Sequence, residues 1–146
     1  MKKCKWCNFK DDYLKLKEYK YWNLYLADSQ FLIGWSHAVL KRHIFFFEEL
    51  SNEELIELKQ VILDWKSGLN KTFQPDWFNV MQLGNMTKHL HFQLAPRYKD
   101  KREFEEKLFV DKDWGNMIVD RWQSENKEFL TKLTNYIKEH IQTSPE

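Results

Sequence analysis

Apolar residues recur every three or four positions in two long segments of the chain, and this spacing predicts two amphipathic helices. The first helix is expected to begin at Ser51, because Glu54 follows three residues later and completes a capping-box pattern. Its apolar pattern ends before Phe73, and the second helix is expected over about 122–141. The apolar residues that define the two faces are Leu55, Leu58, Val61, Ile62, Trp65 and Leu69, followed by Phe129, Leu130, Leu133, Tyr136, Ile137 and Ile141.

Shorter segments outside these helices are rich in aromatic and branched residues or alternate between apolar and polar side chains, as β-strands do. They predict strands over 22–26, 36–40, 77–81 and 89–94. A charged segment over 99–109 predicts a short third helix, and 111–116 is expected to be a surface loop. These elements predict an α+β domain, in which an antiparallel sheet packs against one central and one C-terminal helix.

The composition is that of a single folded domain spanning residues 1–146. Apolar residues make up 42% of the chain and aromatic residues 16%, which excludes a disordered chain. The 23 basic and 22 acidic residues leave a net charge of +1, so neither a nucleic acid nor a membrane is expected as a partner. The longest apolar run, Ile44–Phe47, is far shorter than the roughly 18 residues of a membrane span. Because the basic N-terminus also lacks the apolar core of a signal peptide, we expect a cytoplasmic protein.

The segment 89–94 carries the polar side chains of greatest chemical interest. Because side chains alternate along a strand, His89, His91 and Gln93 are expected on one face, with apolar residues on the other. Neighbouring side chains in this row would be roughly 7 Å apart. Such a row suits an elongated anion such as a phosphate chain, and a neutral imidazole is a nucleophile. The alternative is a polar, solvent-facing strand face without a function.

Three segments of the chain match motifs of one known superfamily. The segment 89–98, HLHFQLAPRY, is similar to its His-φ-His-φ-His-φ-φ motif with a Pro-Arg continuation. The segment 34–44, GWSHAVLKRHI, is similar to its Gly-His-φ-φ-φ-Pro-Lys-Arg-His segment, and 78–85, FNVMQLGN, to the strand and turn before the triad. The predicted central helix falls where these proteins have their long helix. In these features, over about residues 1–98, the chain resembles the histidine triad superfamily, which implies a sheet of about five antiparallel strands with the C-terminal helix as an extension.

The chain departs from the common pattern at the third position of the triad, which is Gln93. The His-x-His-x-Gln form is typical of the branch that contains galactose-1-phosphate uridylyltransferase and diadenosine tetraphosphate phosphorylase, which transfer a nucleotidyl group to an acceptor other than water. Small one-domain members are mostly nucleotide hydrolases or phosphoramidases. Trp35 and Leu40 also replace the usual histidine and proline of the upstream segment. The resemblance therefore implies a nucleotide hydrolase or nucleotidyltransferase, with phosphorylase-type activity included.

The resemblance also implies a covalent mechanism. His91 would attack the α-phosphorus of a nucleotide and form a nucleotidyl-imidazole intermediate, which water, phosphate or a phosphorylated molecule would resolve. Gln93 would hold a non-bridging oxygen of this intermediate. Gln82 matches a family position at the phosphate. Asn85 and Thr87 lie in the turn before the triad, where we expect them to hydrogen-bond phosphate oxygens.

The two cysteines of the chain form a C-x2-C pair, which in a reducing compartment indicates a metal or redox site. Several superfamily members bind zinc through two cysteines and two histidines, and matching positions are filled in this sequence. The resemblance therefore implies a structural zinc site made by Cys4, Cys7, His43 and His89. Such a site would tie the N-terminal arm to the sheet and fix His89 beside the nucleophile. Two free thiols on a frayed N-terminus are the alternative.

Other polar and aromatic residues have roles that the sequence leaves open. Asp28 lies near the position of the family's ribose-binding carboxylate, and it is equally suited to be an ordinary turn residue. His37 misses the family's Gly-His register, so we expect a structural or solvent-facing residue, and His140 is placed to favour the dipole of the C-terminal helix. The tryptophans considered for stacking on a nucleobase are Trp6, Trp22, Trp35 and Trp114.

Two other functional classes stay open. One is a zinc-stabilised nucleotide-binding protein with little or no catalysis, because a triad histidine is missing at Gln93. The other is an RNA-associated protein, which only the aromatic residues and scattered lysines support. A nucleotide or dinucleotide substrate is the expected partner. Small superfamily members usually form dimers by sheet extension, so the resemblance also implies a homodimer.

Overall fold

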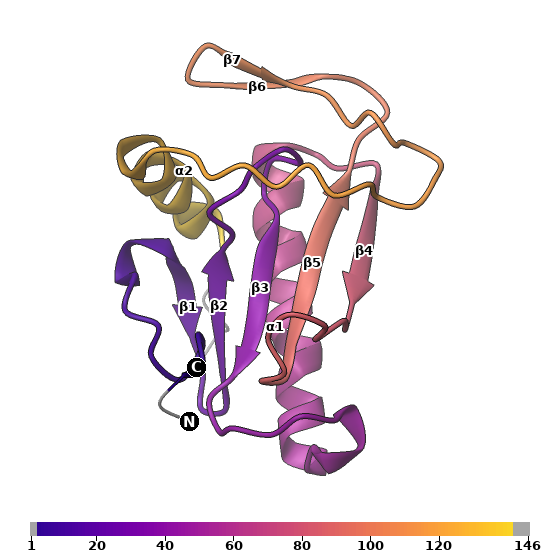
Figure 1. The fold of residues 1–146 in the computed structure, drawn as a ribbon. Helices are drawn as coiled ribbons and strands as arrows, with labels where there is room; N and C mark the ends of the chain where they lie inside the picture. Colours follow the sequence, from indigo (N-terminus) through magenta and orange to yellow (C-terminus); the bar gives the residue numbers. More distant parts are fainter. Residues whose placement is uncertain (1–2, 142–146) are drawn as a thin grey trace.

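A five-stranded antiparallel sheet organises the molecule, and helix α1 covers one of its faces (Figure 1). The computed structural model describes residues 3–141, so both ends of the domain predicted over 1–146 lie outside the described residues. The α+β class, with a sheet of five strands, is confirmed. In sheet order, the strands are β1 (Lys15–Glu18), β2 (Trp22–Leu26), β3 (Ser36–Leu40), β5 (His91–Arg97) and β4 (Trp77–Met81). Two short 3-10 helices are η1 (Asp12–Leu14) and η2 (Phe47–Glu49).

Helix α1 (Asn52–Thr72) forms where the local sequence predicts it. Ser51 Oγ accepts a hydrogen bond from Glu54 N at 3.2 Å, and Glu54 Oε2 accepts one from Ser51 N at 2.9 Å, so the capping box is present. The predicted apolar face packs on the sheet as part of the main core. Its buried members are Leu58, Val61, Trp65 and Leu69.

Close packing between α1 and the sheet depends on Gly34. Its φ of +96° is left-handed, and a Cβ at this position would lie only 2.7 Å from Leu69 Cδ2. The indole Nε1–H of Trp65 donates to the Gly34 carbonyl at 3.2 Å. Gly34 therefore fixes the chain immediately before β3, the strand that carries His37.

The helix predicted over 99–109 is wrong, because this segment forms a β-hairpin. Its strands are β6 (Arg102–Phe104) and β7 (Lys107–Phe109). Glu105 and Glu106 form the turn with φ values of +50° and +63°, which a right-handed helix does not allow. The Phe109 ring stacks on Phe129 of the following helix at 6.0 Å between centroids. Turn geometry and tertiary contacts therefore decide the structure of this charged segment.

Helix α2 (Lys127–His140) begins later than the predicted start near residue 122. Asn126 is its N-cap, and the side-chain Oδ1 accepts a backbone N–H at 2.8 Å. The residues before this cap are extended, and Gln123 N donates to Ser29 Oγ at 3.0 Å. The predicted apolar face is otherwise correct, with Phe129, Leu130, Leu133 and Ile137 buried. Within residues 3–141, no helix is both long enough and apolar enough to cross a membrane.

A buried arginine at the end of β5 fixes the segment that follows the hairpin. Arg97 makes a bidentate ion pair with Asp111, with N–O distances of 2.7 and 3.2 Å. It also donates to the carbonyl oxygens of Asp113 and Asn116 and to Asn79 Oδ1 at 2.8–2.9 Å. The chain then crosses the face of the sheet opposite α1, shown in orange in Figure 1. The surface loop predicted over 111–116 is therefore anchored to the sheet.

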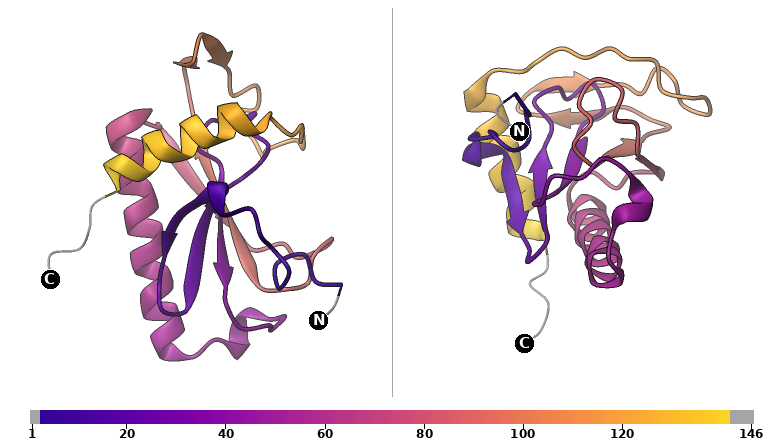
Figure 2. Two further views of the ribbon diagram at one scale, coloured as in Figure 1. Left: turned by 90° about the vertical axis from the view of Figure 1, so that its left-hand side faces the viewer. Right: turned by 60° about the horizontal axis from the view of Figure 1, so that its bottom comes forward.

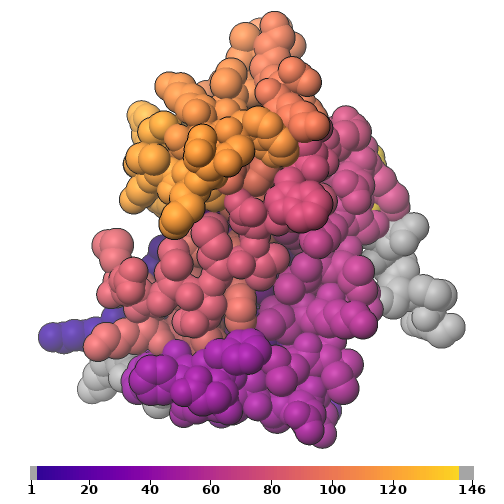
Figure 3. Space-filling model, turned by 90° about the vertical axis from the view of Figure 1, so that its right-hand side faces the viewer, coloured from indigo at the N-terminus to yellow at the C-terminus, as the bar shows by residue number. Residues whose placement is uncertain are grey.

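The β4 edge of the sheet and α1 lie side by side on the surface seen in Figure 3. Among the described residues, β4 pairs only with β5, so its outer edge has unpaired backbone groups. Both elements expose apolar side chains: Ile56 and Leu63 on α1, and Trp77 and Val80 on β4.

Candidate active site and metal centre

Two cysteines and two histidines from distant parts of the sequence come together just before β5. Cys7 Sγ lies 3.2 Å from His43 Nδ1 and 3.5 Å from His89 Nδ1. Cys4 Sγ lies 3.5 Å from His89 Nδ1, and the two histidine Nδ1 atoms are 3.0 Å apart. One ligand atom from each residue lies within 4.8 Å of the other three. The structure thus brings together the four residues that the sequence predicts as metal ligands.

The donor atoms and their spacing fit a tetrahedral metal ion. Zn–S bonds of about 2.3 Å and Zn–N bonds of about 2.0–2.1 Å place tetrahedral ligand atoms about 3.3–3.8 Å apart, close to the observed separations. His89 Nε2–H donates to the Leu40 carbonyl at 2.6 Å, so its Nδ1 carries the lone pair that a metal ion needs. The cluster could therefore hold a zinc ion through two thiolates and two imidazoles.

His91, the predicted nucleophile, is held in one tautomer by its own backbone segment. Its Nδ1–H donates to the His89 carbonyl at 2.7 Å, which leaves the lone pair on Nε2. Burial lowers the pKa of His91 below its ordinary value of 6.5, so the imidazole is neutral at pH 7. His89 therefore contacts two neighbouring groups: the cysteines and His43 through its ring, and His91 through its carbonyl.

The N-terminal arm, residues 3–9, covers the face of the sheet that carries His91. Figure 2 (left) shows α1 on one side of the sheet and the N-terminal segment on the other. The Trp6 ring centroid is 5.5 Å from that of His91 and 5.2 Å from that of His37. As a result, His91 is only 6% exposed. The polar strand face is therefore a buried, aromatic-lined site and not an open surface.

Strand pairing places His37 directly opposite Gln93. Cross-strand partners lie on the same face of a sheet, so both side chains share the face of His91. His37 is buried, and a solvent-facing role for it is wrong. Its burial, with smaller contributions from the charges of His91 and Lys5, lowers the pKa of His37 to about 3. The half-buried amide of Gln93 has no hydrogen-bond partner among the described residues.

The predicted phosphate-binding residues lie in the loop between β4 and β5. Gln82 and Asn85 are exposed and Thr87 is half-buried. Within residues 3–141, none of their side chains is engaged in a hydrogen bond, so their polar groups are available to a ligand. Gly84 has a φ of +79°, which turns this loop between Gln82 and Thr87.

Asp28, the candidate ribose ligand, is engaged by the segment before α2. Its Oδ2 accepts a hydrogen bond from Ser124 Oγ at 3.0 Å, and its carbonyl accepts one from Glu125 N at 2.9 Å. In this state, Asp28 anchors the C-terminal segment to the loop after β2. A ribose hydroxyl would therefore compete with Ser124 for the carboxylate.

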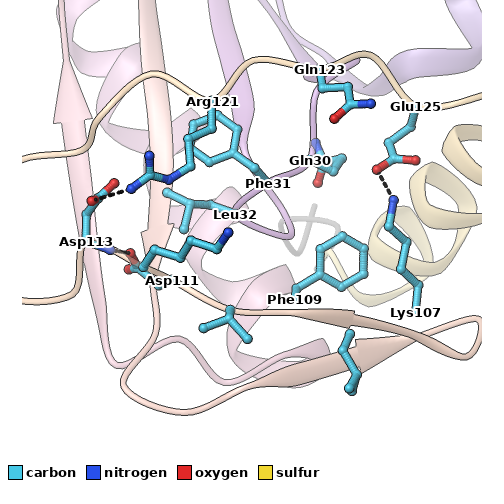
Figure 4. A pocket seen from close by; sticks show the side chains of 13 residues that line it. Gln30, Phe31, Leu32, Lys107, Phe109, Asp111, Asp113, Arg121, Gln123 and Glu125 are labelled. Carbon is cyan, nitrogen blue, oxygen red and sulfur yellow. Dashed lines mark hydrogen bonds and ion pairs between the residues drawn. The ribbon is translucent and has the colours of Figure 1, made fainter.

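A separate cavity of about 340 Å³ opens between β7 and residues 121–125 (Figure 4). Two ion pairs engage charged side chains around it: Arg121 with Asp113 at 3.0 Å, and Lys107 with Glu125. Its apolar lining comprises Phe31, Leu32, Leu108, Phe109 and Val110. No residue predicted as a nucleophile, phosphate ligand or metal ligand lines this cavity, so it is distinct from the His91 site.

Solved structures with the same architecture place these features in a known fold. The chain superposes on a histidine triad protein from Sinorhizobium meliloti with a TM-score of 0.71 and 18% identity, over 87% of this chain and 88% of that one. The chain has the histidine triad fold. No protein family model matches the chain, and no curated protein matches it significantly.

Two further structures with the histidine triad fold are informative. A zinc-bound histidine triad family protein from Mycobacterium smegmatis superposes with a TM-score of 0.62 and 14% identity, over 86% of this chain and 84% of that one. The diadenosine triphosphate hydrolase of Plasmodium falciparum superposes with a TM-score of 0.67 and 15% identity, over 90% of this chain and 78% of that one. Both likenesses concern the fold.

In this histidine triad fold, His89 belongs to the cluster with Cys4, Cys7 and His43, whereas His91 and Gln93 lie on β5. β5 begins at His91 and not at His89 as predicted. The His89 ring lies in the cysteine cluster, and its Nε2–H donates a hydrogen bond to the Leu40 carbonyl. His91 and Gln93 remain on the covered face of the sheet. His89 therefore lies just before the strand, and only His91 and Gln93 of the predicted row belong to β5.

Two of the tryptophans considered for base stacking lie close to the site. Trp6 packs on His91, and Trp35 lies 5.8 Å from Trp122 between ring centroids. Trp22 is completely buried on the opposite face, which excludes it, and Trp114 lies next to Lys99 in the anchored loop. Sequence reasoning missed Trp122, because it assigned this residue to a helix. It also missed His37, whose place in the site follows only from the pairing of β3 with β5.

Proposed function

We propose that the protein hydrolyses or transfers nucleotidyl groups, acting on nucleoside phosphates or dinucleoside polyphosphates through a covalent intermediate on His91. The observation that carries this proposal is the hydrogen bond from His91 Nδ1–H to the His89 carbonyl, because it leaves Nε2 as the nucleophile. The lowered pKa of His91 keeps this nitrogen unprotonated at pH 7. The hydrolase activity named for the Plasmodium falciparum neighbour supports this class of substrate.

The proposed reaction has two steps. In the first, the Nε2 lone pair forms a bond to the α-phosphorus, and the bond to the leaving oxygen breaks with its electron pair going to the leaving group. The Nδ1–H stays bound to the His89 carbonyl, which stabilises the positive charge that develops on the ring. In the second step, an acceptor oxygen attacks the phosphorus, its proton passes to solvent, and His91 leaves as neutral imidazole. The Gln93 amide would donate a hydrogen bond to a non-bridging oxygen in both steps.

We infer that the chain is a single-domain, cytoplasmic member of the histidine triad superfamily. The motif segments of the sequence and the shared fold support this assignment. Gln93 supports a place in the His-x-His-x-Gln branch, with phosphorylase-type transfer included. Gln82, Asn85 and Thr87 are our candidates for phosphate contacts, because their polar groups are available to a ligand.

We also propose that the cluster of two thiolates and two imidazoles holds a structural zinc ion. The zinc-bound neighbour from Mycobacterium smegmatis and the geometry of the cluster support this proposal. When bound, zinc would supply a cross-link between the N-terminal arm and the sheet. His89 would then be fixed at both ring nitrogens, and with it the carbonyl that orients His91.

A second candidate function is nucleotide binding with little turnover. The 6% exposure of His91 favours it, because a substrate phosphorus must reach the ring. Incubation with a panel of mono- and dinucleotides followed by intact mass measurement separates the two functions. A covalent nucleotidyl adduct supports catalysis through His91, whereas tight binding without an adduct or a product supports the binding protein and contradicts our first proposal.

A further inference from the structure

Among the described residues, five buried side-chain polar atoms have no hydrogen-bond partner. They are Trp6 Nε1, Asn23 Oδ1, Trp35 Nε1, His37 Nδ1 and Thr134 Oγ1. Such atoms are rare in folded proteins, because burial removes their hydrogen bonds to water without a replacement. Four of the five, all except the one on α2, lie on or beside the sheet face that carries His91.

Strand register and ring contacts place these atoms. Asn23 pairs with Val39, which pairs with His91, so Asn23 shares the face of the nucleophile. His37 is opposite Gln93 on the same face, and its ring centroid is 6.0 Å from that of His91. Trp6 packs on both rings from the N-terminal arm.

Trp35 is at the far end of this group of rings. Its indole packs with Ala95, which is two residues beyond Gln93 on β5 and therefore on the same face. Trp122 lies between the two ends, 5.8 Å from Trp35 and 5.9 Å from His37 between ring centroids. The unpartnered atoms are thus gathered in one region.

The chemistry of these atoms indicates the kind of ligand that would satisfy them. An indole Nε1–H can only donate a hydrogen bond, so Trp6 and Trp35 both require an acceptor. A neutral imidazole donates through whichever nitrogen carries its proton, and either tautomer is open to His37. A ligand rich in acceptor oxygens, such as a phosphoryl group, would satisfy several of these donors at once.

We propose that His37 is a phosphoryl-binding residue: its Nδ1, unpartnered in the free protein, donates a hydrogen bond to an oxygen of the phosphoryl group that His91 takes up. This inference rests on the proposed function, and it adds a residue from β3 to the proposed site around His91 and Gln93 of β5. The second imidazole of the reacting centre would thus come from the strand opposite Gln93.

Because His37 Nδ1 has no partner in the free protein, replacing His37 should lower the reaction rate without lowering stability. His37→Leu introduces an apolar side chain of moderate size and removes the buried polar atom, so the free protein should be at least as resistant to urea as the wild type. The same variant should form the nucleotidyl adduct from diadenosine tetraphosphate roughly a hundredfold more slowly, as expected for the loss of a buried donor to the transferring group. His37→Gln keeps a donor and should recover at least a tenth of the wild-type rate.

Thr134→Val is the matched control, because it also removes a buried polar atom without a partner but lies on α2. It should match or exceed wild-type stability and keep the wild-type rate. Inorganic phosphate provides a readout that does not depend on turnover: it should shift the ¹⁵N resonances of the His37 ring, and His37→Leu should weaken phosphate binding at least tenfold.

Three results would overturn the role of His37. The first is that His37→Leu keeps more than a third of the wild-type rate. The second is that His37→Leu and His37→Gln both lose rate and stability together. The third is that His37→Leu binds phosphate with unchanged affinity. An adduct on His91 in the wild type, obtained together with any of these results, would leave the proposed function intact and reject His37 alone. If the wild type forms no adduct, the proposed function fails, and the phosphate measurements still decide on His37.

Discussion

Gln93 is expected to select the leaving group and the acceptor. An amide does not exchange a proton near pH 7, whereas a histidine at this position would, and general acid assistance is worth about 10²–10⁴-fold. We therefore predict a preference for leaving groups that need no proton, such as nucleotides, over amines and alcohols. Phosphate or a sugar phosphate, added at a concentration on the order of millimolar, should divert product from the nucleoside monophosphate to the transferred adduct.

Chromatography of the products measures this ratio directly. The control is Gln93→His, which should shift the ratio towards hydrolysis and improve poor leaving groups. Water as the sole acceptor in the wild type would make the protein a hydrolase despite Gln93. An unchanged ratio and rate in Gln93→His would in addition contradict the physical reason given for this residue.

His37 is expected to make the fold sensitive to acid. Its pKa of about 3 in the folded protein is below the ordinary value of 6.5, so between these pH values the unfolded chain binds a proton that the folded protein excludes. The free energy of unfolding is therefore maintained above about pH 6.5 and falls on acidification, by at most ~1.4 kcal/mol per pH unit from this residue. Urea unfolding at pH 7 and at pH 5 should show a smaller loss in His37→Leu than in the wild type. Equal losses would show that His37 is readily protonated in the folded protein.

At the scale of elements, the N-terminal arm is expected to depend on a zinc ion held by Cys4, Cys7, His43 and His89. We predict about one zinc per chain in protein purified without chelators, and loss of the metal with a lower melting temperature in Cys4→Ser, because binding to a folded site adds to the free energy of unfolding. Elemental analysis and thermal melts measure both quantities. His140→Ala is the control, since this imidazole lies outside the cluster and should leave the metal content unchanged. Fully folded, zinc-free protein whose two thiols titrate freely would be contrary to a zinc site.

Helix α1 and the core side of β5 could be predicted because local residues determine them. Ser51 and Glu54 cap the helix within four residues of chain, and apolar residues at helical spacing continue to Leu69. Alternation likewise placed Leu90, Phe92 and Leu94 in the core, where all three are buried. In these segments, propensity, capping and burial favour the same structure.

The hairpin and the start of α2 could not be predicted because distant contacts determine them. Residues 102–109 are mostly charged, and their structure depends on a left-handed turn and on aromatic packing against α2. Residues 122–125 have no sequence signal against helix. Ser29 and Asp28 hold them in extended form across more than ninety positions of sequence, by hydrogen bonds at separations of 94 and 96 residues.

At the scale of the whole molecule, the motif residues of the candidate site could be predicted from the sequence, but the residues around them could not. The four candidate metal ligands and His91 stand in recognisable sequence motifs, and the structure gathers the four candidates into one cluster. His37 and Trp122 enter the site only through the register of β3 with β5 and the path of the C-terminal segment. Neither the strand order nor that path follows from periodicity.

The open β4 edge leads us to predict a homodimer formed by sheet extension. Trp77 and Val80 are 66% and 42% exposed on this edge strand. Light scattering after gel filtration should give twice the chain mass for the wild type. Val80→Lys should give a monomer, because a charge at the edge disfavours strand pairing. Leu108→Lys, which changes an exposed residue of β7, is the control and should remain dimeric. A monomeric wild type at concentrations of about 100 µM would exclude this interface.

The most direct test of covalent catalysis is to locate the nucleotidyl group on the protein. Wild-type protein is mixed with diadenosine tetraphosphate, quenched at alkaline pH, digested and analysed by mass spectrometry. We predict one nucleotidyl group on the peptide that contains His91, attached to the ring of that residue, and no adduct in His91→Ala. This variant should remain folded and lose roughly a thousandfold or more in kcat. Turnover without an adduct on His91, or more than a tenth of the wild-type rate in His91→Ala, would contradict a nucleophilic role for His91.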